Sequence, residues 1–224
     1  MHIIARIRTD FPTKFGVPRQ SGVVPGLTGR VVFEPPYRNS DAVRGLEGFS
    51  HIWLIWQFSE ALRPGWSATV RPPRLGGNRR VGVFATRSPF RPNPIGLSSV
   101  RLERIELDPA LGPVLHVSGI DMVDATPIYD IKPYLPTADS HPDACAGFAE
   151  APHEPLAVDC PEPLLSLIPE QHRTALLAML AQDPRPSYQQ DATRRYGVPF
   201  AGCDIRFSVE GGTLTVREVA PYTP

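Results

Sequence analysis

The sequence has 224 residues, 42% of them hydrophobic and 21% charged, with a formal net charge of zero; this composition is typical of a folded globular protein and excludes a largely disordered chain. A chain of this length can form one large domain, or one domain with a smaller one attached. Because no apolar run approaches the roughly 20 residues that cross a bilayer, and the N-terminal segment lacks the long apolar centre of a signal peptide, we expect a cytoplasmic protein that does not contact a membrane.

Seven short segments in the N-terminal part have the pattern of β-strands. Each is rich in β-branched or aromatic residues and is bounded by Gly, Pro or Asp. The segments are 2–8, 27–33, 49–58, 81–87, 98–107, 113–120 and 128–135. Segment 49–58 carries large apolar residues on both alternating faces, which indicates an interior strand. No helix alternates with these strands and no G-x-G-x-x-G motif occurs, so we predict a mainly β barrel or sandwich and not a Rossmann sheet.

The C-terminal part has a different pattern. Residues 140–162 are polar and rich in proline, and we interpret them as a linker. Residues 169–182 predict a helix with its leucines close to one face, and Asp-Pro follows as a stop signal. Segments 203–209 and 213–219, separated by Glu-Gly-Gly, predict a β-hairpin. We therefore expect a small α+β domain over residues 163–224.

The two halves of the chain have opposite charge. Residues 1–135 contain 17 Lys and Arg against 11 Asp and Glu, whereas residues 136–224 contain 6 against 12. No acidic residue occurs between Glu60 and Glu103, although eight arginines do. Clustered Arg suits phosphate recognition, and Trp66 within this stretch is available to stack on an RNA base. A solvated basic loop is the alternative interpretation.

A rigid loop is predicted within residues 82–99. Three prolines occur within six residues there, which fixes their φ angles and restricts the residues before them. Such a loop holds polar side chains in place with little ordering cost on binding. The polar side chains are Arg87, Arg91 and Asn93, and they indicate a binding loop; a stiffened connection between strands is the alternative.

Four segments of the sequence carry a resemblance to a known family. Residues 15–22, 48–58, 82–102 and 119–139 resemble, in order, the signature blocks of the TsaA-like family of S-adenosylmethionine-dependent tRNA methyltransferases. The resemblance implies a β-barrel methyltransferase domain over residues 1–139 that acts as a homodimer. It also implies methyl transfer from S-adenosylmethionine to N6 of N6-threonylcarbamoyladenosine at position 37, next to the anticodon of a threonine tRNA.

The resemblance also implies a set of site residues. The cofactor contacts it implies are Pro18, Arg19, Gln20, Ser50, His51, Arg87, Leu97, Asp121, Met122, Val123 and Asp124. The urea-like N6 is a poor nucleophile until its proton is removed, so we expect catalytic groups among Asp121, Asp124 and Tyr129. Contacts to the tRNA anticodon arm are expected from Lys14, Arg91, Asn93 and Lys132. The two aspartates capping a turn, and His51 packing in the core, are the structural alternatives.

Two functions of other classes are also compatible with the sequence. A non-enzymatic RNA-binding barrel would keep the basic loop without using an adenosyl pocket. A metal-dependent hydrolase would use His51, His116, Asp121 and Asp124. No HxH or HExxH spacing occurs among the histidines, so we predict no metal site.

Overall fold

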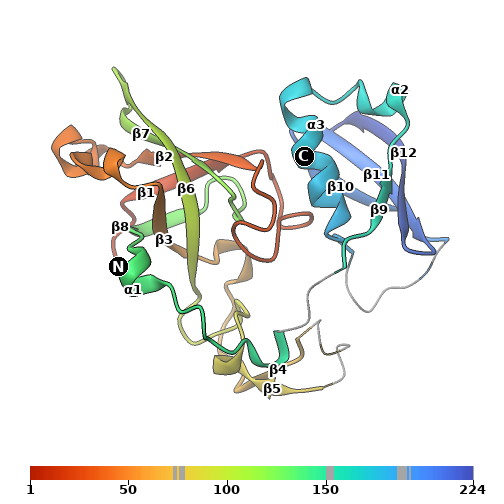
Figure 1. Ribbon diagram of the computed structural model, residues 1–224, viewed down its shortest axis with the longest axis horizontal. Coiled ribbons are helices and arrows are strands. Elements are labelled where there is room, and N and C mark those ends of the chain that lie inside the picture. Colours follow the sequence, from red (N-terminus) through yellow and green to blue (C-terminus); the bar gives the residue numbers. More distant parts are fainter. Residues whose placement is uncertain (73–74, 76–78, 150–153, 186–190, 192, 224) are drawn as a thin grey trace.

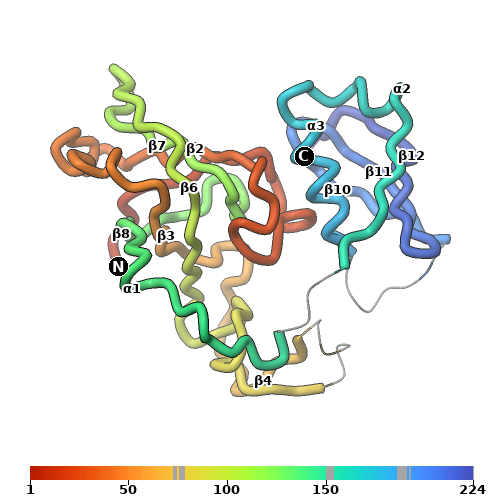
Figure 2. The backbone as a smooth tube through the Cα atoms, in the orientation of Figure 1, coloured from red at the N-terminus to blue at the C-terminus, as the bar shows by residue number. Residues whose placement is uncertain are grey.

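The computed structural model describes residues 1–72, 75, 79–149, 154–185, 191 and 193–223. Figure 1 shows a β-barrel formed by the N-terminal half, an excursion below it that carries β4 and β5, and a C-terminal unit with a helix packed on a sheet. The tube in Figure 2 shows that the excursion leaves the barrel and returns to it before the chain continues to the C-terminal unit. No helix in the described ranges is long and apolar enough to cross a membrane.

Six antiparallel strands close the barrel in the order β1-β2-β7-β6-β3-β8. Alternate side chains of each strand point inward, and the inner positions are apolar, as in Ile7, Leu54 and Ile128, which are fully buried. The mainly β fold and the barrel are therefore confirmed. The strands are β1 (Ala5–Thr9), β2 (Thr28–Phe33), β3 (His51–Gln57), β6 (Ile95–Asp108), β7 (Gly112–Ser118) and β8 (Pro127–Pro133).

One predicted strand, 81–87, was wrong. Only Val81–Gly82 (β5) is extended, and it pairs with β4 (Thr69–Val70) outside the barrel. The chain then turns through the short helix η6 (Val83–Ala85), where the backbone N–H and the hydroxyl of Thr86 both donate to the carbonyl oxygen of Val83. The side chain of Thr86 thus stabilises a turn in a segment whose composition alone favours a strand.

Short helices fill several connections. Those between β2 and β3 are η1 (Pro35–Tyr37), η2 (Ser40–Val43) and η3 (Leu46–Gly48), and η4 (Ser59–Ala61) follows β3. After β8 come α1 (Pro136–Asp139) and η7 (Gly147–Ala149).

The C-terminal unit is a four-stranded sheet in the order β10-β11-β12-β9. The predicted helix and hairpin are present, and the hairpin turns through Gly211 and Gly212, both at positive φ. Strand β9 runs parallel to β12, so the sheet begins inside the segment predicted as a linker, 140–162. The elements are β9 (Ala157–Asp159), α2 (Glu162–Leu165), α3 (Glu170–Ala181), β10 (Tyr196–Phe200), β11 (Cys203–Glu210) and β12 (Thr213–Pro221).

Residues 10–27, which connect β1 to β2, pack against the C-terminal unit. The backbone N–H of Ala201 donates to the carbonyl of Asp10 at 3.1 Å, and the rings of Phe11 and Phe200 lie 5.1 Å apart. Further along, Gly16 lies against Val198, where a Cβ atom would meet the valine side chain at 2.2 Å. Strand β10 therefore packs against this loop through Val198 and Phe200.

Candidate active site

Some of the groups predicted for the cofactor, Gln20, Arg87 and Asp121, lie at one end of the barrel, which we call the barrel mouth. Three segments converge there: the end of loop 10–27, the proline loop 86–94 that enters β6, and residues 119–126 between β7 and β8. β6 pairs with β7 only from Arg101 and Ser118 onward, so the β6 residues before Arg101 pair with β3 alone. The free edge leaves unpaired backbone groups next to the segment that carries Asp121.

Asp121 has the most specific environment at the mouth. The hydroxyl of Ser98 donates to Asp121 Oδ1 at 2.6 Å, and the indole N–H of Trp56 donates to the same hydroxyl at 2.9 Å. Ser98 is fully buried on the inner face of β6. Burial raises the pKa of Asp121 to about 6, although hydrogen bonds from Ser98 and from the Ser21 backbone, and the charge of Arg87, act to lower the pKa. Asp121 is therefore suited to accept a proton near neutral pH.

Arg87 and Gln20 connect the proline loop to loop 10–27. The guanidinium of Arg87 donates to the side-chain oxygen of Gln20, whose amide nitrogen donates to the carbonyl of Arg19. Arg87 is exposed and also influences the pKa of Asp121, so its charge reaches the carboxylate. The Arg87 guanidinium, the Gln20 amide and the Asp121 carboxylate thus border the same mouth.

Most of the remaining residues of these loops have structural contacts. Arg91 Nη1 donates to the carbonyl of Thr86 at 2.7 Å and so holds the proline loop in shape. Asn93 is exposed, and its carbonyl accepts from the backbone N–H of Ile95 at 2.8 Å. Pro18 is buried, whereas Lys14 and Arg19 are exposed on loop 10–27.

Asp124 lies in the same segment as Asp121 but has different partners. Its Oδ1 accepts from the backbone N–H of Thr9 at 3.0 Å, and its Oδ2 lies 3.3 Å from Arg8 Nη1. Its own N–H donates to the carbonyl of Phe11 at 2.8 Å. Both carboxylate oxygens thus attach the segment to β1. Between the two aspartates, Met122 is buried in the core and Val123 is half-buried.

Ser50 and His51 lie next to each other at the start of β3, and Lys132 of β8 lies opposite Trp53. Ser50 Oγ and His51 Nδ1 are 3.0 Å apart, and Lys132 pairs with Asp130 at 2.9 Å on the neighbouring strand β8. His51 is half-exposed at the start of β3, so it is not a core histidine. Leu97, which is 57% exposed, faces Ile55. Ile55 is four residues along β3 from His51, or roughly 13 Å at the usual rise of a strand.

Tyr129 occupies an irregular position in β8. Ile128 pairs with Trp56 and Asp130 pairs with Ile55, so two successive positions of β3 face β8 residues that are two apart. Tyr129 is therefore the extra residue of a β-bulge, a feature that re-aims side chains. It lies level with Ile55 and Trp56 of β3.

Sequence reasoning missed the two groups that fix Asp121 in place. Ser98 and Trp56 come from neighbouring strands, and Ser98 is one of the few polar residues buried in the described chain. The available signal was a serine among apolar residues on one alternating face of β6, between Gly96 and Val100. Among the described residues, no group of three His, Cys, Asp or Glu side chains is placed to hold a metal ion.

Comparison with known proteins identifies the family of the chain. The family model of the tRNA-methyltransferase O N-terminal domain matches residues 6–140, and the family model of the TrmO C-terminal domain matches residues 156–222. The chain belongs to the tRNA-methyltransferase O family. The two matched regions correspond to the barrel with its excursion and to the C-terminal sheet with its helix.

Individual relatives of the tRNA-methyltransferase O family agree with this assignment. A tRNA (adenine(37)-N6)-methyltransferase of Escherichia coli strain K12 is 43% identical, over 97% of this chain and 96% of its own. A putative S-adenosylmethionine-dependent methyltransferase RcsF of Pseudomonas aeruginosa is 43% identical, over 91% and 90%. A crystal structure of TrmO from Pseudomonas aeruginosa superimposes with a TM-score of 0.79 at 36% identity, over 99% of this chain and 98% of that chain.

Proposed function

We propose that this protein transfers a methyl group from S-adenosylmethionine to N6 of N6-threonylcarbamoyladenosine at position 37 of threonine tRNA, in the cytoplasm where tRNA is found. Family membership favours this reaction over the RNA-binding barrel without activity and over the metal-dependent hydrolase. The observation that carries the proposal is the half-buried Asp121, hydrogen-bonded to Ser98 and bordered by Arg87 and Gln20 at the barrel mouth.

The residues of the mouth fit the chemistry of S-adenosylmethionine. Its carboxylate suits the Arg87 guanidinium, and its adenine suits hydrogen bonds from Gln20 and from backbone groups near Leu97 on the free edge of β6. Pro18, Arg19, Met122 and Val123 would shape the walls of this pocket. When bound, the cofactor supplies an electrophilic methyl group.

We assign the role of general base to Asp121. Its carboxylate would accept the proton of N6 as the nitrogen attacks, which restores the nitrogen lone pair that delocalisation otherwise withdraws. Ser98 orients Oδ1, and Trp56 orients Ser98, so the acceptor is fixed before substrate arrives. Asp124 would position this segment through Thr9 and Arg8, and Tyr129 would contact the substrate from the bulge of β8.

Ser98 provides a test of this assignment through pH. Since the Ser98 hydroxyl lowers the pKa of Asp121, Ser98→Ala should raise that pKa further above 6. The acidic limb of kcat against pH should then move up by about one unit, with turnover recovering at higher pH. Ser98→Thr, which keeps the hydroxyl, should restore the limb. If the acidic limb of the kcat profile in Ser98→Ala stays at the wild-type pH, Asp121 is not the group whose titration limits kcat.

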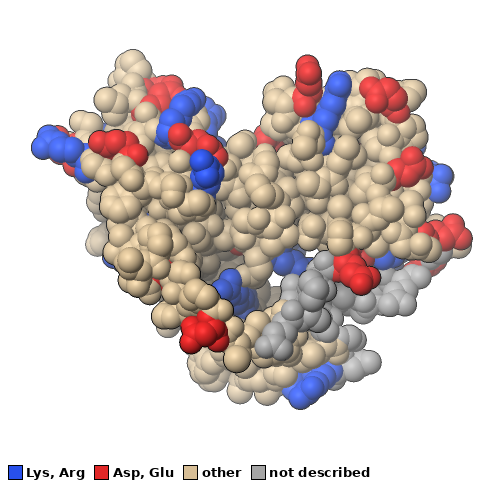
Figure 3. Space-filling view, viewed as in Figure 1, with Lys and Arg blue, Asp and Glu red and all other residues tan. Residues whose placement is uncertain are grey.

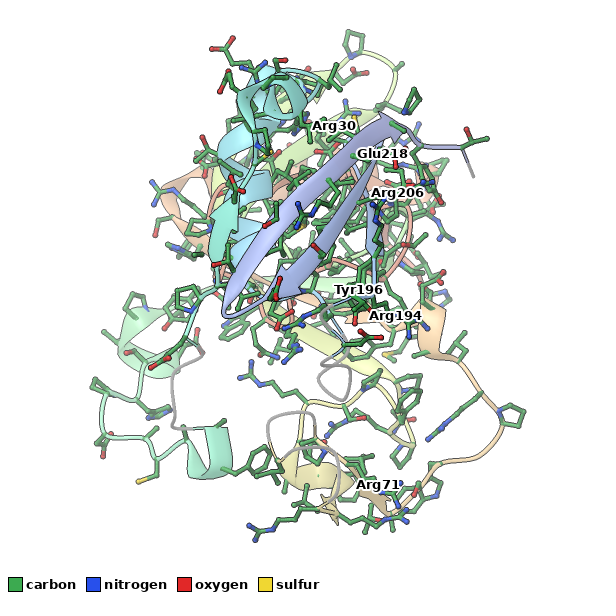
Figure 4. The ribbon with its side chains drawn as sticks, turned by 90° about the vertical axis from the view of Figure 1, so that its right-hand side faces the viewer. Arg30, Arg71, Arg194, Tyr196, Arg206 and Glu218 are labelled. Atoms are coloured by element: carbon green, nitrogen blue, oxygen red, sulfur yellow. The ribbon has the colours of Figure 1, made fainter. Side chains whose placement is uncertain are left out.

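We propose that the anticodon arm binds across the hollow between the barrel, the excursion and the C-terminal unit. Figure 3 shows Lys and Arg side chains gathered in this hollow. Figure 4 shows Arg194 and Tyr196 at the end of the C-terminal sheet that faces the excursion carrying Arg71. Lys14, Arg91, Asn93 and Lys132 would contact the RNA from the barrel. Arg194 and Arg195 are exposed at the start of β10 and would add phosphate contacts.

The contribution of the C-terminal unit can be measured through salt dependence. Arg194→Ala with Arg195→Ala should weaken tRNA binding and reduce the slope of log affinity against log salt by about 2, one for each lost phosphate contact. Arg206→Ala is the matched control, because Arg206 pairs with Asp204 and Glu218 elsewhere on the sheet. An unchanged slope in the double variant would place the RNA away from β10.

We also propose that the protein acts as a homodimer. His51 and the neighbouring Ser50 lie roughly 13 Å along β3 from Ile55, which pairs with Leu97, so one chain does not bring these predicted cofactor residues next to each other. A second copy would bring its own Ser50 and His51 to the mouth. Light scattering of the purified protein tests this: a single-chain mass in the presence of cofactor would reject it.

The proposed function is tested by mass spectrometry of nucleosides from threonine tRNA after incubation with the purified protein and S-adenosylmethionine. We expect a methylated threonylcarbamoyladenosine that does not form without the protein. A separate thermal titration should show S-adenosylmethionine raising the unfolding midpoint, because the ligand binds only the folded state. If the protein binds S-adenosylmethionine but does not methylate this nucleoside, the proposed cofactor site would stand and the proposed substrate would be wrong.

A further inference from the structure

The excursion between β3 and β6 exposes three aromatic rings. Trp66, Phe84 and Phe90, which we call the aromatic cluster, are 52%, 72% and 39% exposed. Trp53 and Trp56, by contrast, are half-buried and buried, and each donates its indole N–H to a side chain of the protein. Exposed apolar surface that is concentrated in one place marks an interaction site.

The geometry of the aromatic cluster suits flat ligands. The rings of Trp66 and Phe84 are stacked, with centroids 6.1 Å apart and an interplanar angle of 29°. Arg63 lies 4.0 Å above the ring of Phe90, and Arg91 lies 6.0 Å from the ring of Phe84. Trp66, Phe90 and both arginines line a cleft of about 490 Å³. Aromatic and guanidinium planes of this kind are the surfaces on which proteins stack nucleobases.

The charge around the cleft selects the kind of partner. The stretch from Arg63 to Arg101 contains eight arginines and no Asp or Glu. Arg63 and Arg91 of this stretch line the cleft. A basic cleft attracts a polyanion and disfavours a second copy of itself, because two copies would bring like charges together. Arg91 is held by the Thr86 carbonyl, so part of this charge is fixed in place.

The position of the cleft relates it to the barrel mouth. Phe90 and Arg91 belong to the proline loop whose Arg87 contacts Gln20, and the carbonyl of Pro94 accepts from the N–H of Phe58 at the end of β3. A nucleotide bound at the aromatic cluster is therefore a near neighbour of a nucleotide bound at the mouth.

We propose that Trp66, Phe84 and Phe90, with Arg63 and Arg91, bind an unpaired nucleobase of the anticodon loop next to the methylated adenosine. This inference rests on the proposed function, and it adds a second RNA-binding subsite to the barrel mouth. Stacking makes the subsite tolerant of base identity, since every base has a π-face. It requires single-stranded RNA, because a paired base does not expose both faces.

The test compares Trp66→Ala with Trp66→Phe in the full-length protein, using a synthetic hairpin RNA with the anticodon-arm sequence of threonine tRNA. Trp66→Ala should weaken hairpin binding about 5- to 150-fold, whereas Trp66→Phe, which keeps an aromatic face, should restore most of it. KM for tRNA should rise with little change in kcat, and the thermal shift with S-adenosylmethionine should be unchanged. Leu107→Ala, at an exposed site near the far end of β6, is the matched control.

Each outcome decides the inference. If Trp66→Ala binds the hairpin with wild-type affinity, the inference is overturned, even if the methylated nucleoside still forms. If Trp66→Ala weakens binding to a fully paired RNA duplex as much as binding to the hairpin, the cluster does not act by stacking on an unpaired base, and the inference fails. If Trp66→Ala instead converts a dimer to a single chain, the cluster is a contact between copies and the inference fails. Absence of methylation in the wild type would reject the proposed function independently.

Discussion

Asp121→Asn should lower kcat for tRNA methylation by about 10²- to 10⁴-fold, the usual contribution of a general base. Asparagine has nearly the same shape and still accepts the Ser98 hydrogen bond, so the expected loss reflects the missing proton acceptor. Single-turnover methylation with saturating tRNA and S-adenosylmethionine measures it. Asp41→Asn, at an exposed ion pair with Arg44 outside the mouth, is the control. Normal turnover in Asp121→Asn would remove Asp121 from catalysis.

The same substitution should change stability in a pH-dependent way. The pKa of Asp121 rises from an ordinary value of 3.8 to about 6 on folding, because burial disfavours the charged carboxylate. The unfolded chain therefore loses this proton first, and the contribution of Asp121 to wild-type stability falls as pH rises from about 4 to about 6. Asp121→Asn lacks this loss, so it should be the more stable protein above pH 6, by at most about 3 kcal/mol. Urea unfolding at both ends of this pH range measures the difference, which should vanish near pH 4.

Gly96→Ala should destabilise the barrel and disturb the mouth together. A Cβ atom at Gly96 would lie 2.2 Å from Trp56 Cε2 and 2.5 Å from two further indole carbons. Since Trp56 is buried, its ring must move, which we expect to cost about 1–3 kcal/mol of unfolding free energy. The movement would also break the hydrogen bond from the indole to Ser98 and so release Asp121. Urea unfolding and methylation assays should therefore both show a loss.

Gly48→Ala is the matched control for that substitution. Gly48 also has an ordinary φ, and no heavy atom lies within 4 Å of a Cβ built there. The unfolding free energy of Gly48→Ala should therefore be nearly that of the wild type. Combining Gly96→Ala with Trp56→Phe, which has a smaller ring, should cost less than the two single changes added together. Strict additivity in this double-mutant cycle would contradict the direct contact.

Elements whose pattern is local could be predicted from the sequence. The strand over β3, the helix α3 and the hairpin β11–β12 follow from apolar periodicity and turn residues, and the structure confirms them. Segment 81–87 could not, because a side-chain hydrogen bond from Thr86 favours a turn over a strand of the same composition. Strand β9 was hidden because it pairs with β12, more than fifty residues away.

The candidate site shows the same division between local and long-range information. Asp121 and Asp124 are two carboxylates three residues apart in one short segment, and the sequence does not distinguish them. Their environments differ only because Ser98 and Trp56 from distant strands reach one, while Thr9 and Arg8 reach the other. Partners of this kind depend on strand register and closure of the barrel, which a single sequence does not specify.

A crystal structure of the protein soaked with S-adenosylmethionine tests the central claim most directly. We predict the cofactor at the barrel mouth, with its carboxylate within hydrogen-bond distance of Arg87, its adenine near Gln20 and the edge of β6, and its methyl group facing the side of Asp121. Cofactor bound away from these residues would contradict the account.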